Sequence, residues 1–203
     1  SWPKPESVYA AVEDYQRRVG VSLGRGGYAE AEEVGEIAEF ARAAVARLIG
    51  AESPDRIIFT LNGTDSLNLA IHGILRPGNH VVTTVVEHNS VLRPLRRLEK
   101  HNGVEVTRVG CNEFGVVSAQ DIRAAIRPNT KLIAVTHASN VTGAIQPVAE
   151  IGAIAREHGV LFLVDAAQTL GHIRVDVSEI GADLLAAPGH KGLLGPLGTG
   201  ILY

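Results

Sequence analysis

Residues 161–168 read Leu161-Phe162-Leu163-Val164-Asp165-Ala166-Ala167-Gln168. Four consecutive apolar residues without polar alternation indicate a strand that is buried on both faces, as the strands of parallel sheets are. The strand ends at a carboxylate, and a buried carboxylate is costly unless it meets a cation or several hydrogen-bond donors. The stretch therefore predicts a parallel sheet with a polar site at the carboxyl end of this strand.

Segments of the same apolar kind alternate with helical segments along most of the chain. The predicted helices end at stop signals such as Pro77-Gly78 or Gly159. This alternation predicts an α/β protein with a mostly parallel sheet. We expect strands at 56–60, 80–84, 104–109, 132–137, 161–165 and 184–187, with a further strand starting at residue 200, and helices at 6–18, 29–49, 66–75, 91–101, 119–126 and 148–158.

The composition is that of a folded domain. The chain has 203 residues, of which 45% are apolar, and a formal net charge of −3. Its basic residues are scattered, which argues against a nucleic-acid partner. No apolar run reaches the roughly 20 residues of a membrane span, and no apolar signal segment opens the sequence. We therefore expect a cytoplasmic protein without a membrane partner. Cys111 is the single cysteine, which excludes an internal disulfide.

The first 50 residues differ in pattern from the rest of the chain. They contain two predicted helices joined by the loop Gly24-Arg25-Gly26-Gly27, whereas the alternation of strands and helices starts after Gly50. We therefore divide the chain into an N-terminal helical segment with a Gly-rich loop, residues 1–50, and a large α/β domain, residues 51–203.

Five predicted strand ends carry polar residues that packing does not explain. Ligands bind at the carboxyl ends of the strands in sheets of this kind, so these residues are candidates for one site. The five segments are Asn62-Gly63-Thr64-Asp65, Glu87-His88-Asn89, His137-Ala138-Ser139-Asn140, Asp165-Ala166-Ala167-Gln168 and Gly189-His190-Lys191.

The first of these segments has the features of a phosphate site. Gly63 lets the backbone approach a ligand, Thr64 offers a hydroxyl, and the free N–H groups of a helix start attract anions. The alternative is a routine helix cap by Thr64 or Asp65. Neither a P-loop nor a G-x-G-x-x-G turn is present, which argues against a dinucleotide site.

The other candidates also have simpler interpretations. Asp165 could be a helix N-cap, His88 could be a structural histidine, and Lys191 could be an exposed loop lysine. Alternatively, the Gly-rich loop holds the Lys191 amine near buried walls, where partial desolvation makes it a usable nucleophile toward a carbonyl. A metal cluster of His88, His137 and His190 lacks any recognised ligand spacing, so we expect no metal.

Together the five segments supply the groups that pyridoxal 5'-phosphate needs. Its phosphate needs a cradle, its pyridine nitrogen needs a carboxylate to stay protonated, and its phenolate oxygen needs donors. Its aldehyde needs a lysine, and its flat face needs a stacking partner such as an imidazole. We therefore expect pyridoxal 5'-phosphate as the cofactor.

The same segments resemble, in order, the motifs of cysteine desulfurases, which belong to the class V aminotransferase group of fold-type I pyridoxal-phosphate enzymes. The resemblance covers essentially the whole chain. It implies the large domain of a fold-type I transferase, with three α/β/α layers and a sheet of the seven-stranded type, without the family's small C-terminal domain. The similar stretches are residues 60–68, 87–90, 137–143, 164–168 and 189–192, and residues 1–5 and 24–27 also resemble the family's N-terminal region.

The resemblance implies roles around the ring of the cofactor. Lys191 would form an imine with the cofactor and then shuttle protons, and His88 would stack on the ring and assist as an acid or base, so these two would be catalytic. Asp165 would pair with the pyridinium nitrogen. Gln168 would reach the phenolate oxygen, and Asn140 would hold the same edge of the ring or the carboxylate of the substrate.

The resemblance assigns the phosphate to Gly63, Thr64 and His190, and two departures from the family pattern stand out. Pro188 occupies a position where the family usually has Ser or Thr, whose hydroxyl binds the phosphate, and proline has neither a hydroxyl nor an N–H. Tyr28 stands where many relatives have a histidine after the glycine loop.

The activity implied is that of a homodimeric enzyme that takes sulfur from L-cysteine, leaves L-alanine, and passes the sulfur to an enzyme thiol, with a sulfur-acceptor protein as a further partner. The family's persulfide-forming cysteine lies in the C-terminal domain, and Cys111 reads as a small apolar filler instead. The alternatives are another class V enzyme acting on a related amino acid, such as a C–S lyase, a selenocysteine lyase or an aminotransferase, or a non-catalytic fragment of the fold.

Overall fold

The computed structural model describes residues 3–24 and 26–203. Its centre is one seven-stranded sheet with the strand order β1-β7-β6-β5-β4-β2-β3. Within the described residues, β7 is the one strand that points opposite to the other six, so the predicted mostly parallel sheet is confirmed. The strands are β1 Ile58–Thr60, β2 His80–Thr84, β3 Glu105–Val109, β4 Thr130–Thr136, β5 Leu161–Asp165, β6 Leu184–Pro188 and β7 Gly200–Leu202.

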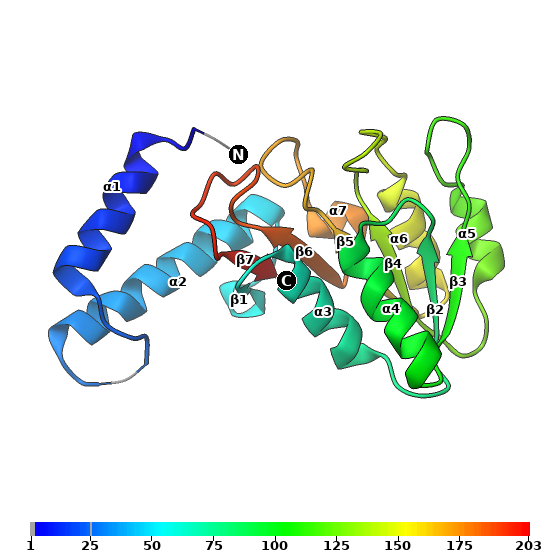
Figure 1. Cartoon of the computed structure of the whole chain (residues 1–203), viewed down its shortest axis with the longest axis horizontal. Coiled ribbons are helices and arrows are strands. Elements are labelled where there is room, and N and C mark those ends of the chain that lie inside the picture. Colours follow the sequence, from blue (N-terminus) through cyan, green and yellow to red (C-terminus); the bar gives the residue numbers. More distant parts are fainter. Residues whose placement is uncertain (1–2, 25) are drawn as a thin grey trace.

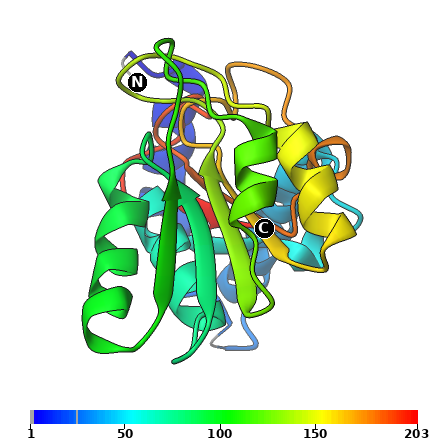
Figure 2. The same cartoon turned by 90° about the vertical axis from the view of Figure 1, so that its right-hand side faces the viewer.

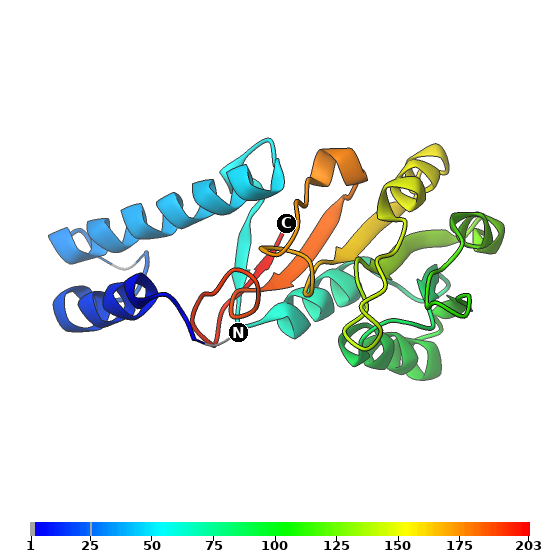
Figure 3. The same cartoon turned by 90° about the horizontal axis from the view of Figure 1, so that it is seen from above.

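Helices cover both faces of the sheet, which confirms the three-layer architecture (Figure 3). Figure 2 shows α4 on one side of the strands and α5 and α6 on the other. One face carries α3 (Gly63–Ile74) and α4 (Asn89–His101). The other face carries α5 (Ala119–Ala125), α6 (Val148–Glu157) and α7 (Val177–Ile180). Each face has its own cluster of buried apolar side chains.

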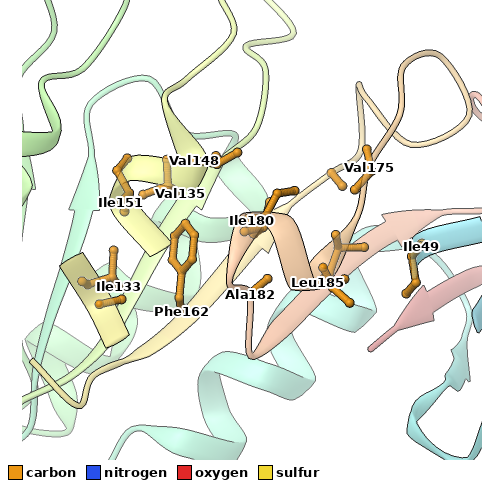
Figure 4. Close-up of a cluster of buried hydrophobic side chains, with 14 of the residues drawn as sticks. Ile49, Ile133, Val135, Val148, Ile151, Phe162, Val175, Ile180, Ala182 and Leu185 are labelled. Atoms are coloured by element: carbon orange, nitrogen blue, oxygen red, sulfur yellow. The ribbon is translucent and has the colours of Figure 1, made fainter. Parts of the chain in front are cut away.

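The two clusters share the central strand β5, as the side-chain period of two requires. Phe162 and Val164 belong to the cluster beneath α6 and α7, whereas Leu163 belongs to the cluster beneath α3 and α4. Figure 4 shows the Phe162 ring beside Ile151 and Ile180. Full burial of such a side chain contributes about 2 kcal/mol, so this apolar strand anchors both layers at once.

The N-terminal helices extend away from the sheet (Figure 1). α1 (Glu6–Asp14) continues as a short π-helix over Tyr15–Val19, and α2 (Ala29–Ile49) follows with the predicted bounds. Only the end of α2 joins the core of the sheet, where Ala46 and Ile49 are buried. The division of the chain at residue 50 stays a prediction, and Ser1, Trp2 and Arg25 lie outside the described residues.

Two of the predicted strands are not buried on both faces. β1 and β3 form the two edges of the sheet, and most of their side chains are partly or fully exposed. The prediction was wrong here because an edge position depends on the order of strands in space, which no single segment encodes.

Two helices start earlier than predicted and one was missed. α3 starts at Gly63 and α4 at Asn89, because Asn62 and His88 cap them with their side chains. α7 has four residues, too few to show a helical period.

Among the described helices, none is long and apolar enough to cross a membrane.

Candidate active site

The eight residues predicted for the site line one cavity at the carboxyl edge of the sheet. Its volume is about 150 Å³. Its walls come from the segments after β1, β2, β4, β5 and β6, because these strands all point their carboxyl ends to the same edge. The predicted residues in its lining are Gly63, Thr64, His88, Asn140, Asp165, Gln168, His190 and Lys191.

The start of α3 forms one end of this cavity. Asn62 is the N-cap: its side chain accepts the N–H of Asp65 at 2.9 Å, and Asp65 in turn accepts the N–H of Leu61 at 3.1 Å. The interpretation of Thr64 or Asp65 as the cap was therefore wrong. Because Asn62 does the capping, the Thr64 hydroxyl is available for other partners.

Gly63 brings the backbone of α3 against the end of β6. A Cβ atom at Gly63 would lie 3.0 Å from Cδ of Pro188, so a larger residue would force one of the two segments to move. The N–H groups of Gly63 and Thr64 belong to the first turn of the helix, where no preceding carbonyl can accept them. Both residues line the cavity, and free N–H groups at a helix start are donors suited to an anion.

A chain of hydrogen bonds links this end of the cavity to the start of α4. The Thr64 hydroxyl lies 2.7 Å from the hydroxyl of Ser90, which lies 2.8 Å from Nδ1 of His88. The same Nδ1 accepts the N–H of Ser90 at 3.1 Å, so His88 is the N-cap of α4. Ser90 was not predicted as a site residue, although it stands directly after the Glu87-His88-Asn89 segment.

Asp165 is a buried carboxylate, and one of its two oxygens already accepts a hydrogen bond. It is 4% exposed, and its Oδ1 accepts the N–H of Ala167 at 2.9 Å. Burial raises the pKa of Asp165, and the Ala167 N–H and the positive charge of Lys191 oppose this shift. The interpretation of Asp165 as a helix N-cap was wrong, because a turn and not a helix follows it. The Ala167 N–H uses one oxygen, and a further cation would stabilise the charged form.

Glu87, which belongs to one of the predicted strand-end segments but was given no role there, is a second buried carboxyl. Its Oε1 accepts the Thr84 hydroxyl at 2.7 Å and the Thr136 N–H at 2.9 Å, whereas its Oε2 is buried without a partner. Burial raises the pKa of Glu87 to about 8 and the charge of Asp165 adds to this, although the two hydrogen bonds work against it. Glu87 is therefore mainly neutral at pH 7.

The loop after β6 holds Lys191 at the cavity wall. A Cβ atom on Gly192 would collide with the carbonyl oxygen of Leu170, so the loop can pack this closely only with glycine there. The Lys191 carbonyl accepts the N–H of Leu194 at 2.9 Å, and Leu194 has a φ of 58°, a strained value for a residue with a side chain. Lys191 is partly buried, not fully exposed as its simpler interpretation held.

His190 presents an unused hydrogen-bonding atom. Its Nδ1 is buried and has no partner. Burial lowers the pKa of His190, and the positive charges of Lys191 and Lys4 lower it further. A neutral ring with a buried free nitrogen is costly unless a ligand atom completes its bond.

These residues fit pyridoxal phosphate. The free N–H groups at Gly63 and Thr64 suit a phosphate, and the buried carboxylate of Asp165 suits a protonated ring nitrogen. The unpartnered Nδ1 of His190 gives the same indication, since it lacks a bond that a ligand could supply. Pro188 contributes no hydroxyl, so the phosphate end depends on the other donors.

Other candidates from the sequence lie apart from this cavity. Cys111 is exposed in the loop after β3, so its interpretation as an apolar filler was wrong, and it lines a separate surface pocket. His137 is buried, and its Nδ1 lies 3.1 Å from the hydroxyl of Thr169. Tyr28 is 45% exposed at the start of α2. Among the described residues, no group of three His, Cys, Asp or Glu side chains is placed to hold a metal ion.

A mostly parallel sheet with a lysine loop, a buried carboxylate and a helix start at one edge defines an α/β protein with a ligand site at its strand ends. The chain belongs to the aminotransferase class-V family, whose model matches residues 1–203. Class-V aminotransferases and cysteine desulfurases are families of pyridoxal-phosphate enzymes, so the resemblance drawn from the motifs is confirmed.

The chain is similar to cysteine desulfurases in sequence and structure. A probable cysteine desulfurase from Methanothermobacter thermautotrophicus is 44% identical over 99% of this chain and 50% of its own length. The apo structure of a cysteine desulfurase from Thermococcus onnurineus NA1 matches with a TM-score of 0.91 and 37% identity, over 98% of this chain and 50% of that one. A structure of SspA in complex with cysteine matches with a TM-score of 0.92 and 34% identity, over 99% of this chain and 58% of that one. The chain thus spans about half the length of the similar cysteine desulfurases.

Proposed function

We propose that this chain is the cofactor-binding part of a pyridoxal-phosphate cysteine desulfurase, an enzyme that removes sulfur from L-cysteine and leaves L-alanine. The observation that carries this proposal is the convergence of eight nominated residues, from five separate segments, on one cavity. The similarity to cysteine desulfurases supports the proposed reaction, and the similarity to SspA, whose structure contains cysteine, supports the proposed substrate.

The cofactor, when bound, supplies an electron sink for the charge that develops at the substrate Cα. Asp165 would keep the proton on the ring nitrogen, because its buried carboxylate is stabilised by a cation at that point. The Lys191 amine would hold the cofactor and afterwards carry a proton at Nζ, which its place in the cavity wall allows.

The remaining residues would position the cofactor. His88 would stack on the ring and act through its Nε2, since its Nδ1 is occupied by Ser90. Gln168 would donate to the phenolate oxygen, and Asn140 would hold the same edge of the ring or the substrate carboxylate. Gly63, Thr64 and His190 would hold the phosphate.

The thiol that receives sulfur is proposed to lie outside these 203 residues. Cys111 is the single cysteine, and it lines a pocket formed by Gly110, Asn112 and Ser118 instead of the site cavity. The homodimer, the sulfur-acceptor protein and the cytoplasmic location expected from the sequence stay predictions.

Reduction of the cofactor-loaded protein with borohydride tests the proposal. We expect pyridoxyl label on Lys191 alone after peptide mapping, because this amine lies in the cavity wall. Lys191→Ala should lose the label and the visible absorbance while the thermal midpoint stays close to that of the parent chain. Lys131 and Lys100 serve as internal controls, and recovery of the label on either one contradicts the assignment of Lys191.

A second experiment separates the reaction from the cofactor. The full-length enzyme, given L-cysteine and a reductant, should release sulfide and alanine in equal amounts. If Lys191 is labelled but the full-length enzyme transaminates, or releases pyruvate, the desulfurase assignment is wrong while the cofactor site stands.

A further inference from the structure

Three groups form a continuous hydrogen-bond chain across the site. The hydroxyl of Thr64, in the first turn of α3, is 2.7 Å from the hydroxyl of Ser90, in the first turn of α4. The hydroxyl of Ser90 is 2.8 Å from Nδ1 of His88. All three residues line the cavity, and Ser90, the middle member, is 7% exposed, whereas Thr64 and His88 are exposed.

The backbone sets the direction of this chain at one end. A peptide N–H can only donate, and the N–H of Ser90 points at Nδ1 of His88 at 3.1 Å. Nδ1 must therefore carry a lone pair, so the proton of the neutral ring sits on Nε2. The hydroxyl of Ser90 can then donate to Nδ1, and it can accept from the hydroxyl of Thr64.

The chain has a second arrangement when Thr64 finds another acceptor. Each hydroxyl has one proton to donate. If an anion at the start of α3 takes the proton of Thr64, the oxygen of Thr64 can accept from Ser90. Because the two hydroxyl oxygens lie 2.7 Å apart, one proton must lie between them, so the proton of Ser90 turns from Nδ1 of His88 to Thr64, and Nδ1 keeps the backbone N–H as its single donor.

We propose that Ser90 is a positioning residue that transmits the occupancy of the anion site beside Thr64 to the ring of His88. The ring is held by two hydrogen bonds while the anion site is empty and by one when it is filled. This inference rests on the proposed function, since it concerns the imidazole that would stack on the cofactor. It predicts that the hydrogen bonding of His88 differs between the empty and the occupied phosphate end.

The test uses the full chain without cofactor, labelled with ¹⁵N in histidine and in the backbone, and inorganic phosphate as the probe. We expect the Nδ1 resonance of His88 to report an unprotonated nitrogen. On addition of phosphate it should move toward the position of a nitrogen with fewer donors, in step with the backbone amide resonance of Thr64.

Variants separate transmission from packing. In Ser90→Ala the amide of Thr64 should still respond to phosphate while the response of His88 Nδ1 is lost, and Ser90→Thr, which restores the hydroxyl, should recover it. Ser118→Ala, which removes the cap hydroxyl of α5 away from the cavity, is the matched control and should behave like the parent chain.

Three results would overturn the inference: a His88 response that survives in Ser90→Ala, a parent chain in which Thr64 responds and His88 does not, and phosphate that leaves the amide of Thr64 unmoved. None of these measurements uses pyridoxal phosphate or cysteine. Failure of the Lys191 labelling and failure of the Ser90 relay are therefore separate outcomes.

Discussion

Buried polar groups are hydrogen-bonded at the amino end of β2 but incompletely bonded past its carboxyl end. At its amino end His80 is fully buried, with Nδ1 2.7 Å from the Thr130 hydroxyl and Nε2 2.9 Å from the Thr107 hydroxyl. Past its carboxyl end Glu87 is buried with one oxygen unpartnered, and Nδ1 of His190 is in the same condition. A buried polar group costs stability unless it is bonded, so the bonded His80 favours stability and the two unpartnered atoms cost it. Of these two, His190 lines the cavity and can gain its missing bond from a ligand.

The two ends also respond to pH in opposite directions. Burial lowers the pKa of His80, so its contribution to stability is present above its ordinary pKa and is lost as the pH falls. Burial raises the pKa of Glu87 from 4.5 to about 8, so its contribution is present below pH 4.5 and is lost as the pH rises toward 8. A pH series therefore separates the stability of one end from that of the other.

The largest effect is expected at Asp165, where a substitution should impair the reaction without lowering the stability of the chain. Asp165→Asn removes the partner of the ring nitrogen, and we expect exchange of the substrate Cα proton to slow by about 1,000-fold, on the order of 4 kcal/mol. The cofactor-free variant should be at least as stable as the parent at pH 7, because burial raises the pKa of Asp165. Cα proton exchange in D₂O measures the effect on the reaction, and urea unfolding measures the effect on stability. Unchanged exchange would mean that Asp165 only stabilises the turn after β5.

Glu87→Gln sharpens the pH contrast. The parent chain should lose about 3 kcal/mol of unfolding free energy from this group between pH 5 and pH 8, since each unit of pKa shift is worth about 1.4 kcal/mol. The glutamine keeps an oxygen for Thr84 and Thr136 and does not titrate, so that part of the slope should vanish. Parallel slopes for the two proteins in urea unfolding would show that Glu87 is charged in the folded chain at neutral pH.

His80→Ala tests the amino end and should destabilise the chain by about 2 kcal/mol through the cavity that it leaves. The cost stays moderate because the Thr130 hydroxyl also accepts the Arg127 N–H at 2.7 Å, and so keeps a partner. Cofactor affinity should not change in this variant. A loss of affinity as large as the loss of stability would show that the two ends are not independent.

The smallest effect is expected at Cys111. Cys111→Ser should leave stability within about 0.5 kcal/mol, as exposed substitutions generally do. The isolated chain, loaded with cofactor and given L-cysteine and a reductant, should release no sulfide at a catalytic rate, with or without this change. Sustained sulfide release that disappears in Cys111→Ser would contradict the proposal that the receiving thiol lies elsewhere.

Much of the site could be predicted from the sequence because it lies at the ends of apolar strands. The parallel arrangement brings those ends together, so Asp165 and Lys191 could be assigned to one site without knowing their distance. The bounds of α2 could also be predicted, because the helical period of its apolar residues and the Gly50 that ends it are both visible in the local sequence.

The remainder depended on contacts between segments that are distant in sequence. The role proposed for Ser90 depends on its hydrogen bond to Thr64, which belongs to another helix. The hydrogen bonding of Glu87 likewise depends on the N–H of Thr136 on another strand. The exposure of β1 and β3 likewise follows from the strand order. No local pattern of residues encodes such pairings.

The position of β7 between β1 and β6 has a consequence for how this chain acquires its structure. Ile58 pairs with Leu202, so β1 has no neighbour until nearly the whole described chain has been synthesised. Closing so long a loop carries an entropic cost, and contacts between residues far apart in sequence slow folding. On the ribosome, β1 should remain an unpaired edge while β2 to β6 assemble. A chain arrested before residue 200 should therefore be the species most exposed to aggregation or to capture by a chaperone.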